Sequence, residues 1–430
     1  MSSQTTISAP PPLPPLRPAT ELGRRAATLV FLAFAFAYFL SALIRAITAT
    51  LAPTLTQEFA LQARDLGLLA GGYFLGFSLT QLPLGTWLDR HGPKRVILCF
   101  LAIAVVGCLA FSVATSFSGL LAARVLCGVG VSACLMAPLT GYRRWFAPAA
   151  QLRGNSWMLM TGSLGMVAST LPVQWLMPLT GWRPLFWGLA LFVLLAMAVI
   201  AWQVPRWDNA PHEAGPTRSA PAGYAVIWEH PYFRKMVPMG FFCYGGLVAM
   251  QTLWAAPWMI KIAGYSPLQA ATGLFWINVA MLGTFWTWGL VNPGLTRRGI
   301  SADRLMVWGL PLSFMILAII VIAGQAISTG AGVLWALYCM SCTFVSLSQP
   351  AVAMAFPAAL AGRALSAYNL VIFLGVFVIQ WGVGLLIDGF HALGFGDVLS
   401  FQLAFGVYLG CGVLSYAYFW ASKSHNQRSS

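Results

Sequence analysis

The chain has 430 residues, a mean hydropathy of +0.77 and a formal net charge of +14, yet only 8% of its residues are charged and 59% are hydrophobic. A soluble protein of this composition would expose large apolar patches, so the composition argues against a soluble globular domain. The basic residues stand singly or in small groups between apolar runs and form no basic stripe, which argues against a nucleic-acid partner.

Residues 1–27 form a polar, proline-rich tail that we expect to be disordered. Apolar runs of about 20 residues follow, the length that crosses the hydrocarbon core of a bilayer. They are continuously apolar rather than alternating, which favours helices, since lipid leaves no external partner for the backbone. We predict twelve transmembrane helices, at 28–52, 66–88, 96–115, 120–142, 154–178, 184–203, 233–258, 267–291, 304–326, 330–355, 363–388 and 398–421.

The segment 204–232 is polar and proline-rich and falls between the sixth and seventh runs. It reads as a linker that divides the chain into an N-terminal six-helix half, 28–203, and a C-terminal half, 233–421, followed by a short tail, 422–430. We therefore predict an all-α polytopic membrane protein with two halves.

The basic residues predict the orientation. Most of the 24 Lys and Arg fall in the two tails, the linker and every second loop, whereas the alternate loops hold Arg64, Arg183 and Lys261. Because positive loops stay in the cytoplasm, both termini and the linker are expected there. The sequence thus predicts a multi-pass protein of the cell inner membrane.

Charge concentrates in "QLPLGTWLDRHGPKR", residues 81–95, between the second and third spans. A second pattern, "RVLCGVG", lies in the fourth span. The residues that carry the two patterns are Gly85, Asp89, Arg90, Gly92, Lys94 and Arg95 in the first, and Arg124, Gly128 and Gly130 in the second.

Both patterns resemble those of the major facilitator superfamily, a family of secondary transporters. The resemblance implies twelve helices in two pseudo-symmetric six-helix bundles, with a central site reached alternately from either side. It also implies that the six residues of the first pattern govern gating, with Asp89 facing the start of the eleventh span near Arg363. A carboxylate there would meet the positive end of a helix.

The ten acids and five histidines lie outside the predicted spans, except Asp388, which is the last residue at the outer end of 363–388, so a midplane proton carrier is missing. Two arginines lie inside spans. Arg45, eight residues before Pro53, resembles the substrate-binding arginine of two anion-transporting branches, the organophosphate–phosphate antiporters and the anion–cation symporters. The partner charges of those branches do not carry over, since Ile44 and Gln251 stand at two of their positions.

Five residues are predicted to contact substrate: Arg45, Arg124, Tyr73, Gln251 and Asn369. Spans seven and eleven line the cavity in the family, which favours the last two. For Arg124 a structural or gating role stands equally open. Further candidate polar partners inside the spans, each of which alone more often forms an interhelical hydrogen bond than binds a ligand, are Gln81, Asn278, Gln349 and Gln380.

The predicted function is transport of a small organic anion, carboxylate-like, by exchange or uniport rather than proton symport. Two alternatives stay open: an exporter of drugs or metabolites from the same superfamily, and a transport-derived membrane sensor. An enzyme is disfavoured because no catalytic or metal-ligating set is apparent. The expected partners are the anionic substrate and the lipid bilayer, for a monomer without a cofactor.

Overall fold

The computed structural model describes residues 21–207 and 224–426. The first twenty residues of the predicted tail, most of the predicted linker and residues 427–430 lie outside this description.

Within the described residues every regular element is a helix. The N-terminal half contains α1 (Arg24–Phe59), α2 (Ala63–Leu79), α3 (Gln81–Val113), α4 (Phe117–Val131), α5 (Ala133–Trp145), α6 (Pro148–Ala168), α7 (Leu171–Thr180) and α8 (Trp182–Gln203). The C-terminal half contains α9 (Ala225–Glu229), α10 (Pro231–Pro238), η1 (Met239–Tyr244), α11 (Gly245–Ala249), η2 (Met250–Trp254), α12 (Ala255–Lys261), α13 (Pro267–Arg297), α14 (Ala302–Ala323), η3 (Gly324–Gly330), α15 (Ala331–Cys342), η4 (Thr343–Leu347), α16 (Ser348–Met354), α17 (Ala358–Ala392) and α18 (Asp397–Asn426).

Nine stretches of the described residues are long and apolar enough to cross a membrane. One of them, Ala302–Met354, is long enough for two crossings, which makes ten. Two further crossings complete the predicted twelve. One is formed by α2 and continues past an interruption at Thr80, and the other is formed by α6 and α7, which are separated at 169–170. Large apolar side chains project outward, with Ile322 79% and Leu414 70% exposed. Lipid tails would cover such a surface, and the predicted all-α membrane fold is confirmed.

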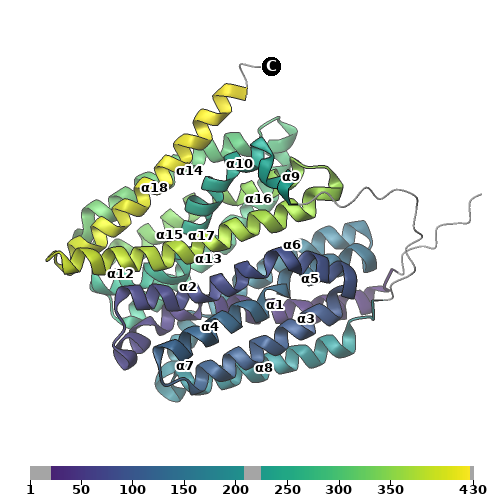
Figure 1. Cartoon of the computed structure of the whole chain (residues 1–430), viewed down its shortest axis with the longest axis horizontal. Helices are drawn as coiled ribbons and strands as arrows, with labels where there is room; N and C mark the ends of the chain where they lie inside the picture. The colour runs from purple at the N-terminus through teal and green to yellow at the C-terminus, as the bar shows by residue number, and fades with distance from the viewer. Residues whose placement is uncertain (1–20, 208–223, 427–430) are drawn as a thin grey trace, which may run out of the picture.

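The two halves lie side by side, the N-terminal half from purple to blue and the C-terminal half from teal to yellow (Figure 1). They meet where α2 packs along α17, where α6 and α7 pack on α13, and where α1 contacts η2 and α12. We call the end of the bundle that holds Gly92 and Val204 the linker end, and the end that holds Gln62 and Leu393 the distal end. The positive-inside pattern predicts that the linker end faces the cytoplasm.

The charged segment after the second span is more helical than a loop. Residues 89–95 were expected to connect two spans, but α3 is helical through His91 and again from Pro93, so that only Gly92 departs from helical geometry. Gly92 has φ 75° and ψ 161°, a region that favours glycine, and proline is preorganised to begin a helix. The connection between the two spans is therefore a single residue.

Two glycines of the fourth span let α4 pack closely against its neighbours. A Cβ at Gly128 would overlap the backbone carbonyl of Tyr73 on α2, and one at Gly130 would overlap the backbone of Ala104 on α3. Since the obstacle is backbone rather than a flexible side chain, a larger residue would push the helices apart. This packing fixes Arg124, one turn before Gly128, at the junction of α1, α2 and α4.

The seventh span departs from α-helical geometry. Its segments Met239–Tyr244 and Met250–Trp254 are π-helical turns on either side of the short α11. Such turns widen a helix and are often found at functional sites. Tyr244 ends the first turn and Gln251 lies in the second, so both side chains project from a locally widened helix.

Candidate functional site

Arg45 lies near the middle of α1 and faces the C-terminal half. Its guanidinium interacts electrostatically with the hydroxyls of Tyr73 on α2 and Tyr244 on η1. The side chain is half-buried, and its Nε is buried with no hydrogen-bond partner in the described chain. None of the ion pairs formed by the described residues includes Arg45. A guanidinium placed in this way is suited to bind an anion.

The C-terminal half places a chain of neutral polar groups opposite Arg45. The Tyr244 hydroxyl donates to Oε1 of Gln349 on α16 over 3.1 Å. Nε2 of Gln349 donates in turn to Oδ1 of Asn369 on α17 over 2.7 Å. Tyr244 therefore connects the cation of the N-terminal half to two amides of the C-terminal half, and the structure brings the predicted residues Arg45 and Asn369 to one region.

Arg124 and Tyr73 lie behind Arg45, within the N-terminal half. Arg124 is 0% exposed, and its Nη1 donates to the carbonyl of Ile44 over 2.9 Å. Its guanidinium lies 5.1 Å from the ring centroid of Tyr73, whose hydroxyl donates to the Ser41 carbonyl over 3.4 Å. Arg124 thus holds the α1 backbone at the residue before Arg45, while Nε and Nη2 find no partner among the described residues.

Gln251 is hydrogen-bonded inside the C-terminal half and not to the Tyr244 chain. Its Nε2 donates to Oδ1 of Asn278 on α13 over 2.8 Å, and the two side chains are 7% and 3% exposed. Nearby, Nε2 of Gln380 donates to Oγ1 of Thr252 over 3.0 Å. These contacts are the interhelical hydrogen bonds that the sequence predicted for Asn278 and Gln380.

The residues predicted to govern gating gather at the linker end. Gly92 is covered by the Trp207 ring, which would overlap a Cβ there, and the Arg144 guanidinium lies 4.6 Å from the same ring. Lys94 Nζ donates to the carbonyl of Val204 over 2.7 Å, and burial lowers the pKa of this amine. The first pattern is thereby attached to residues that lead into the linker.

Three charged neighbours of that turn are exposed to the surroundings of the bundle. Asp89, Arg90 and Arg95 are exposed. No hydrogen bond or ion pair joins Asp89 to another described residue. On the preceding turn, a Cβ built at Gly85 would lie 4.0 Å from Oγ of Ser366 on α17, so the helices approach each other without a tight contact.

A cavity of about 970 Å³ lies between the halves at the distal end. The residues that line it come mainly from α1, α2, η2, α12, α17 and α18 and include Pro53, Arg64, Lys261, Asp388 and Phe401. Ala52, the lining residue of α1 nearest to Arg45, is two helical turns away, about 10 Å along the axis.

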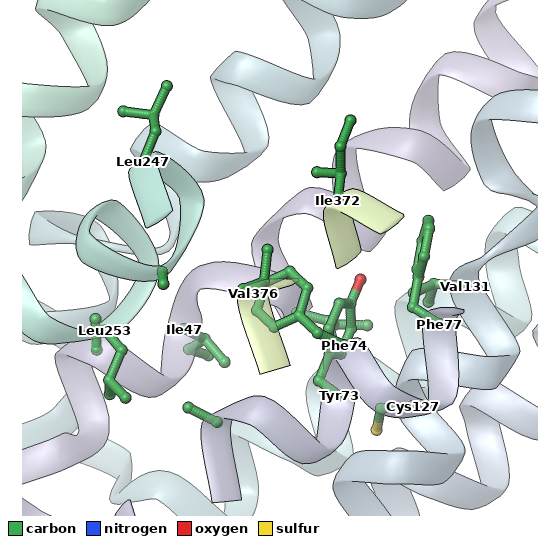
Figure 2. Packing of buried hydrophobic residues seen from close by; sticks show 14 of the residues in the cluster. Ile47, Tyr73, Phe74, Phe77, Cys127, Val131, Leu247, Leu253, Ile372 and Val376 are labelled. Carbon is green, nitrogen blue, oxygen red and sulfur yellow. The ribbon is translucent and has the colours of Figure 1, made fainter. Parts of the chain in front are cut away.

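Buried apolar side chains of both halves lie in the same part of the molecule as Arg45. Ile47 on α1, Phe74 on α2, Leu253 on η2 and Val376 on α17 are at most 1% exposed and belong to one buried cluster (Figure 2). The polar groups of Arg45, Tyr244 and Gln349 therefore stand among apolar neighbours within the spans.

Asp388 near the end of α17 joins the halves at the distal end by capping a helix of the other half. Its two carboxylate oxygens accept from the backbone N–H groups of Ala63 and Arg64, at 3.2 and 2.8 Å. These are the first residues of α2, where the helix dipole is positive. A Cβ at Gly384 would overlap the Ala63 carbonyl, which shows how closely the two helix ends approach.

Sequence reasoning missed three residues of this region, namely Tyr38, Tyr244 and Asp388. Tyr38, which interacts electrostatically with Tyr244, lies two helical turns before Arg45, and that spacing could have placed it on the same face. Tyr244 lies two turns before Gln251 and could have been found in the same way. Asp388 was assigned to the distal end, but its contact with α2 depends on a pairing of helices that no local pattern encodes.

Comparison with known proteins gives a consistent picture. The family model described as Major Facilitator Superfamily matches residues 34–380. The chain is 24% identical over 307 residues to the 3-(3-hydroxy-phenyl)propionate transporter of Escherichia coli K12, covering 66% of this chain and 71% of that protein. It is 23% identical over 289 residues to a probable sulfoacetate transporter of Cupriavidus necator, covering 62% of this chain and 63% of that protein.

The fold is shared with solved transporters. A bacterial homologue of the human lysosomal transporter Spinster, in an inward-facing and unoccupied conformation, superposes with a TM-score of 0.75 at 17% identity, covering 94% of this chain and 98% of that one. At this identity the likeness concerns the fold alone.

Proposed function

Since the chain belongs to the major facilitator superfamily, whose model matches residues 34–380, we propose that it transports a small organic anion across the inner membrane by alternating access. The observation that carries this proposal is Arg45, a half-buried cation within a span that no described carboxylate neutralises. The relatives named for 3-(3-hydroxyphenyl)propionate and sulfoacetate, both organic acids, support the substrate class.

A carboxylate is the group that Arg45 would hold best. The guanidinium presents a planar fork of N–H donors that matches two carboxylate oxygens, and both partners are charged. Arg124 restrains the α1 backbone directly before Arg45, which reduces the freedom that the side chain would lose on binding. In this proposal Arg45 is the substrate ligand, and Arg124 and Tyr73 are positioning residues.

Proton coupling is disfavoured in this proposal. Secondary transporters that carry protons use an Asp, Glu or His within the membrane, and here those residues fall at the ends of the spans or beyond them. We therefore favour exchange or uniport. Substrate-driven flux in proteoliposomes should leave the external pH constant, and a stoichiometric alkalinisation would contradict this mode of transport.

The proposal is tested by uptake of labelled 3-(3-hydroxyphenyl)propionate and sulfoacetate into proteoliposomes, paired with binding to the purified protein. Arg45→Ala should weaken binding of the accepted anion about 10- to 100-fold, because it removes hydrogen bonds between charged groups. Arg45→Lys should recover little, since an ammonium lacks the fork.

Arg304→Ala is the matched control. It removes the same charge from an exposed position near the start of α14 and should leave binding unchanged. Equal affinity for the anion in wild type and Arg45→Ala would overturn the assignment of Arg45 as the anion ligand.

A further inference from the structure

The two halves present different chemistry to the region around Tyr244. The N-terminal half contributes the cation Arg45, and the C-terminal half contributes a phenol and two amides, those of Tyr244, Gln349 and Asn369. A ligand bound between them would meet a positive charge on one side and neutral hydrogen-bonding groups on the other.

The chain of Tyr244, Gln349 and Asn369 differs from the other polar pairs of the C-terminal half. The Gln251–Asn278 and Gln380–Thr252 pairs are at most 7% exposed and join helices internally. Asn369, the last residue of the chain of side chains, is 4% exposed, but Tyr244 and Gln349 are only half-buried, although they lie within spans. They retain surface that a ligand can reach, whereas a purely structural hydrogen bond has no need of it.

The hydrogen bonds of this chain leave both donors and acceptors unused. Tyr244 donates to Gln349, so its oxygen can still accept, and one N–H of the Gln349 amide is left. The Asn369 amide accepts from Gln349, and neither of its N–H groups has a partner among the described residues. A phenol and two amides that offer both kinds of group suit a hydroxyl, which both donates and accepts.

The same region is unsuited to a second charge. Arg124, the arginine that lies behind Arg45 in the N-terminal half, is 0% exposed and bonded to the Ile44 carbonyl. A second carboxylate on the substrate would therefore lie among neutral amides without a counter-charge, which is costly away from water.

From this we infer that the substrate is a hydroxylated monocarboxylate, whose carboxylate binds Arg45 and whose hydroxyl binds the chain of Tyr244, Gln349 and Asn369. The inference rests on the proposed function and adds Gln349 and Tyr244 as residues that determine specificity. The names of the two relatives do not decide the point, because 3-(3-hydroxyphenyl)propionate carries a hydroxyl and sulfoacetate carries none.

The test measures binding of matched pairs that differ by one hydroxyl: 3-(3-hydroxyphenyl)propionate with 3-phenylpropionate, and 4-hydroxybenzoate with benzoate. Wild type should bind the hydroxylated member of an accepted pair about 10- to 100-fold more tightly, since a site built to hydrogen-bond a hydroxyl rejects the analogue without it. Gln349→Met should bring this ratio close to one, mainly by weakening the hydroxylated member.

Tyr244→Phe removes a single oxygen and provides a second variant if Gln349→Met does not fold. It should also reduce the ratio, while the affinity for the deoxy member stays within about threefold, as expected for the loss of one hydrogen bond to the hydroxyl. Gln402→Met is the matched control, because the Gln402 amide donates to the Val321 carbonyl and lies on α18. It should leave the ratio unchanged.

The outcomes separate this inference from the proposed function. If Arg45→Ala abolishes binding of both members but Gln349→Met and Tyr244→Phe keep the wild-type ratio, the hydroxyl inference is wrong and the anion site stands. A wild type that binds sulfoacetate and none of the hydroxylated acids also overturns the inference. If Arg45→Ala binds both members as wild type does, the proposed anion site itself fails.

Discussion

The two ends of the interface between the halves each carry an aspartate, and the two aspartates differ in their contacts. At the distal end, the Asp388 carboxylate of α17 accepts from two backbone N–H groups at the start of α2. At the linker end, Asp89 of α3 is exposed and bonds to no other described residue, although Gly85, one turn away, approaches Ser366 of α17. An aspartate thus lies at each end of the interface, but only the distal one forms hydrogen bonds with the other half.

This difference indicates which of the two carboxylates links the halves in the structure. The distal contact joins α17 to the start of α2, beside the cavity that lies between the halves. A contact made in one state only shifts the balance between states by its own free energy. The asymmetry therefore predicts opposite effects for changes at the two ends, and the following substitutions test it.

The largest effect is expected at Gly67. A Cβ there would overlap the carbonyl of Gln380 on α17, so that a side chain must push α2 and α17 apart at the distal end. Overpacking of this kind costs about 1–3 kcal/mol, which alters the ratio of states about 5- to 150-fold. Gly67→Val should hold the distal end open and strongly reduce transport. Spin labels at Gln57 and Lys261, which line the distal cavity from opposite halves, would report the longer distance.

Gly382→Val is the matched control for this prediction. Gly382 lies on α17, two residues after Gln380, and a Cβ there meets nothing within 4 Å. The control carries the same cost of valine in a helix but should transport normally. Normal transport by Gly67→Val with an unchanged label distance would show that the close approach of α2 and α17 is not required.

A smaller effect in the same direction is expected at Asp388. Asp388→Ala removes two hydrogen bonds from a carboxylate to the start of α2, and the 22% exposure of its side chain limits the loss to about 1–2 kcal/mol. The distal end should open about 5- to 30-fold more often, which the Gln57–Lys261 label pair again measures.

Asp65→Ala serves as the control for Asp388. The Asp65 carboxylate accepts from the Gln62 N–H in the first turn of α2, within one half. It should cost stability of α2 without opening the distal end. If both variants open it equally, the effect comes from loss of helix capping and not from the bond between the halves.

The helices could be predicted from the sequence, whereas some of their ends could not. Continuous apolar runs predicted the crossings because bilayer thickness and backbone hydrogen bonding leave few alternatives. The first helix runs seven residues beyond its predicted end at 52, past Pro53, and the signature segment 89–95 is helical on both sides of Gly92. Charge and glycine predict a loop, but packing of Trp207 on Gly92 allows a turn of one residue.

The candidate site was predictable where a residue is costly in a membrane. Arg45 could be identified because a cation within a span is costly unless it faces a partner or a cavity. Tyr244 and Asp388 could not, because a tyrosine in an apolar run and an acid at a span end are both ordinary. Their roles depend on which helices of the two halves face each other, and this pairing appears only in three dimensions.

The smallest effect is expected at Asp89, and its direction is opposite. Asp89 bonds to no described residue here, but Gly85, one turn before it, approaches Ser366 of α17, and closure of the linker end would bring Asp89 toward the positive start of that helix. Loss of an exposed charge at a helix end is worth about 0.3–1 kcal/mol. Asp89→Asn should therefore favour the state seen here by about two- to fivefold and slow turnover, with substrate affinity largely kept.

Labels at His91 and Gly362, both exposed at the linker end, would show fewer short distances than in wild type. The distal label pair should remain unchanged, which distinguishes this variant from Asp388→Ala. If the His91–Gly362 distances match those of wild type, Asp89 is a surface charge, and a carboxylate links the two halves at the distal end alone.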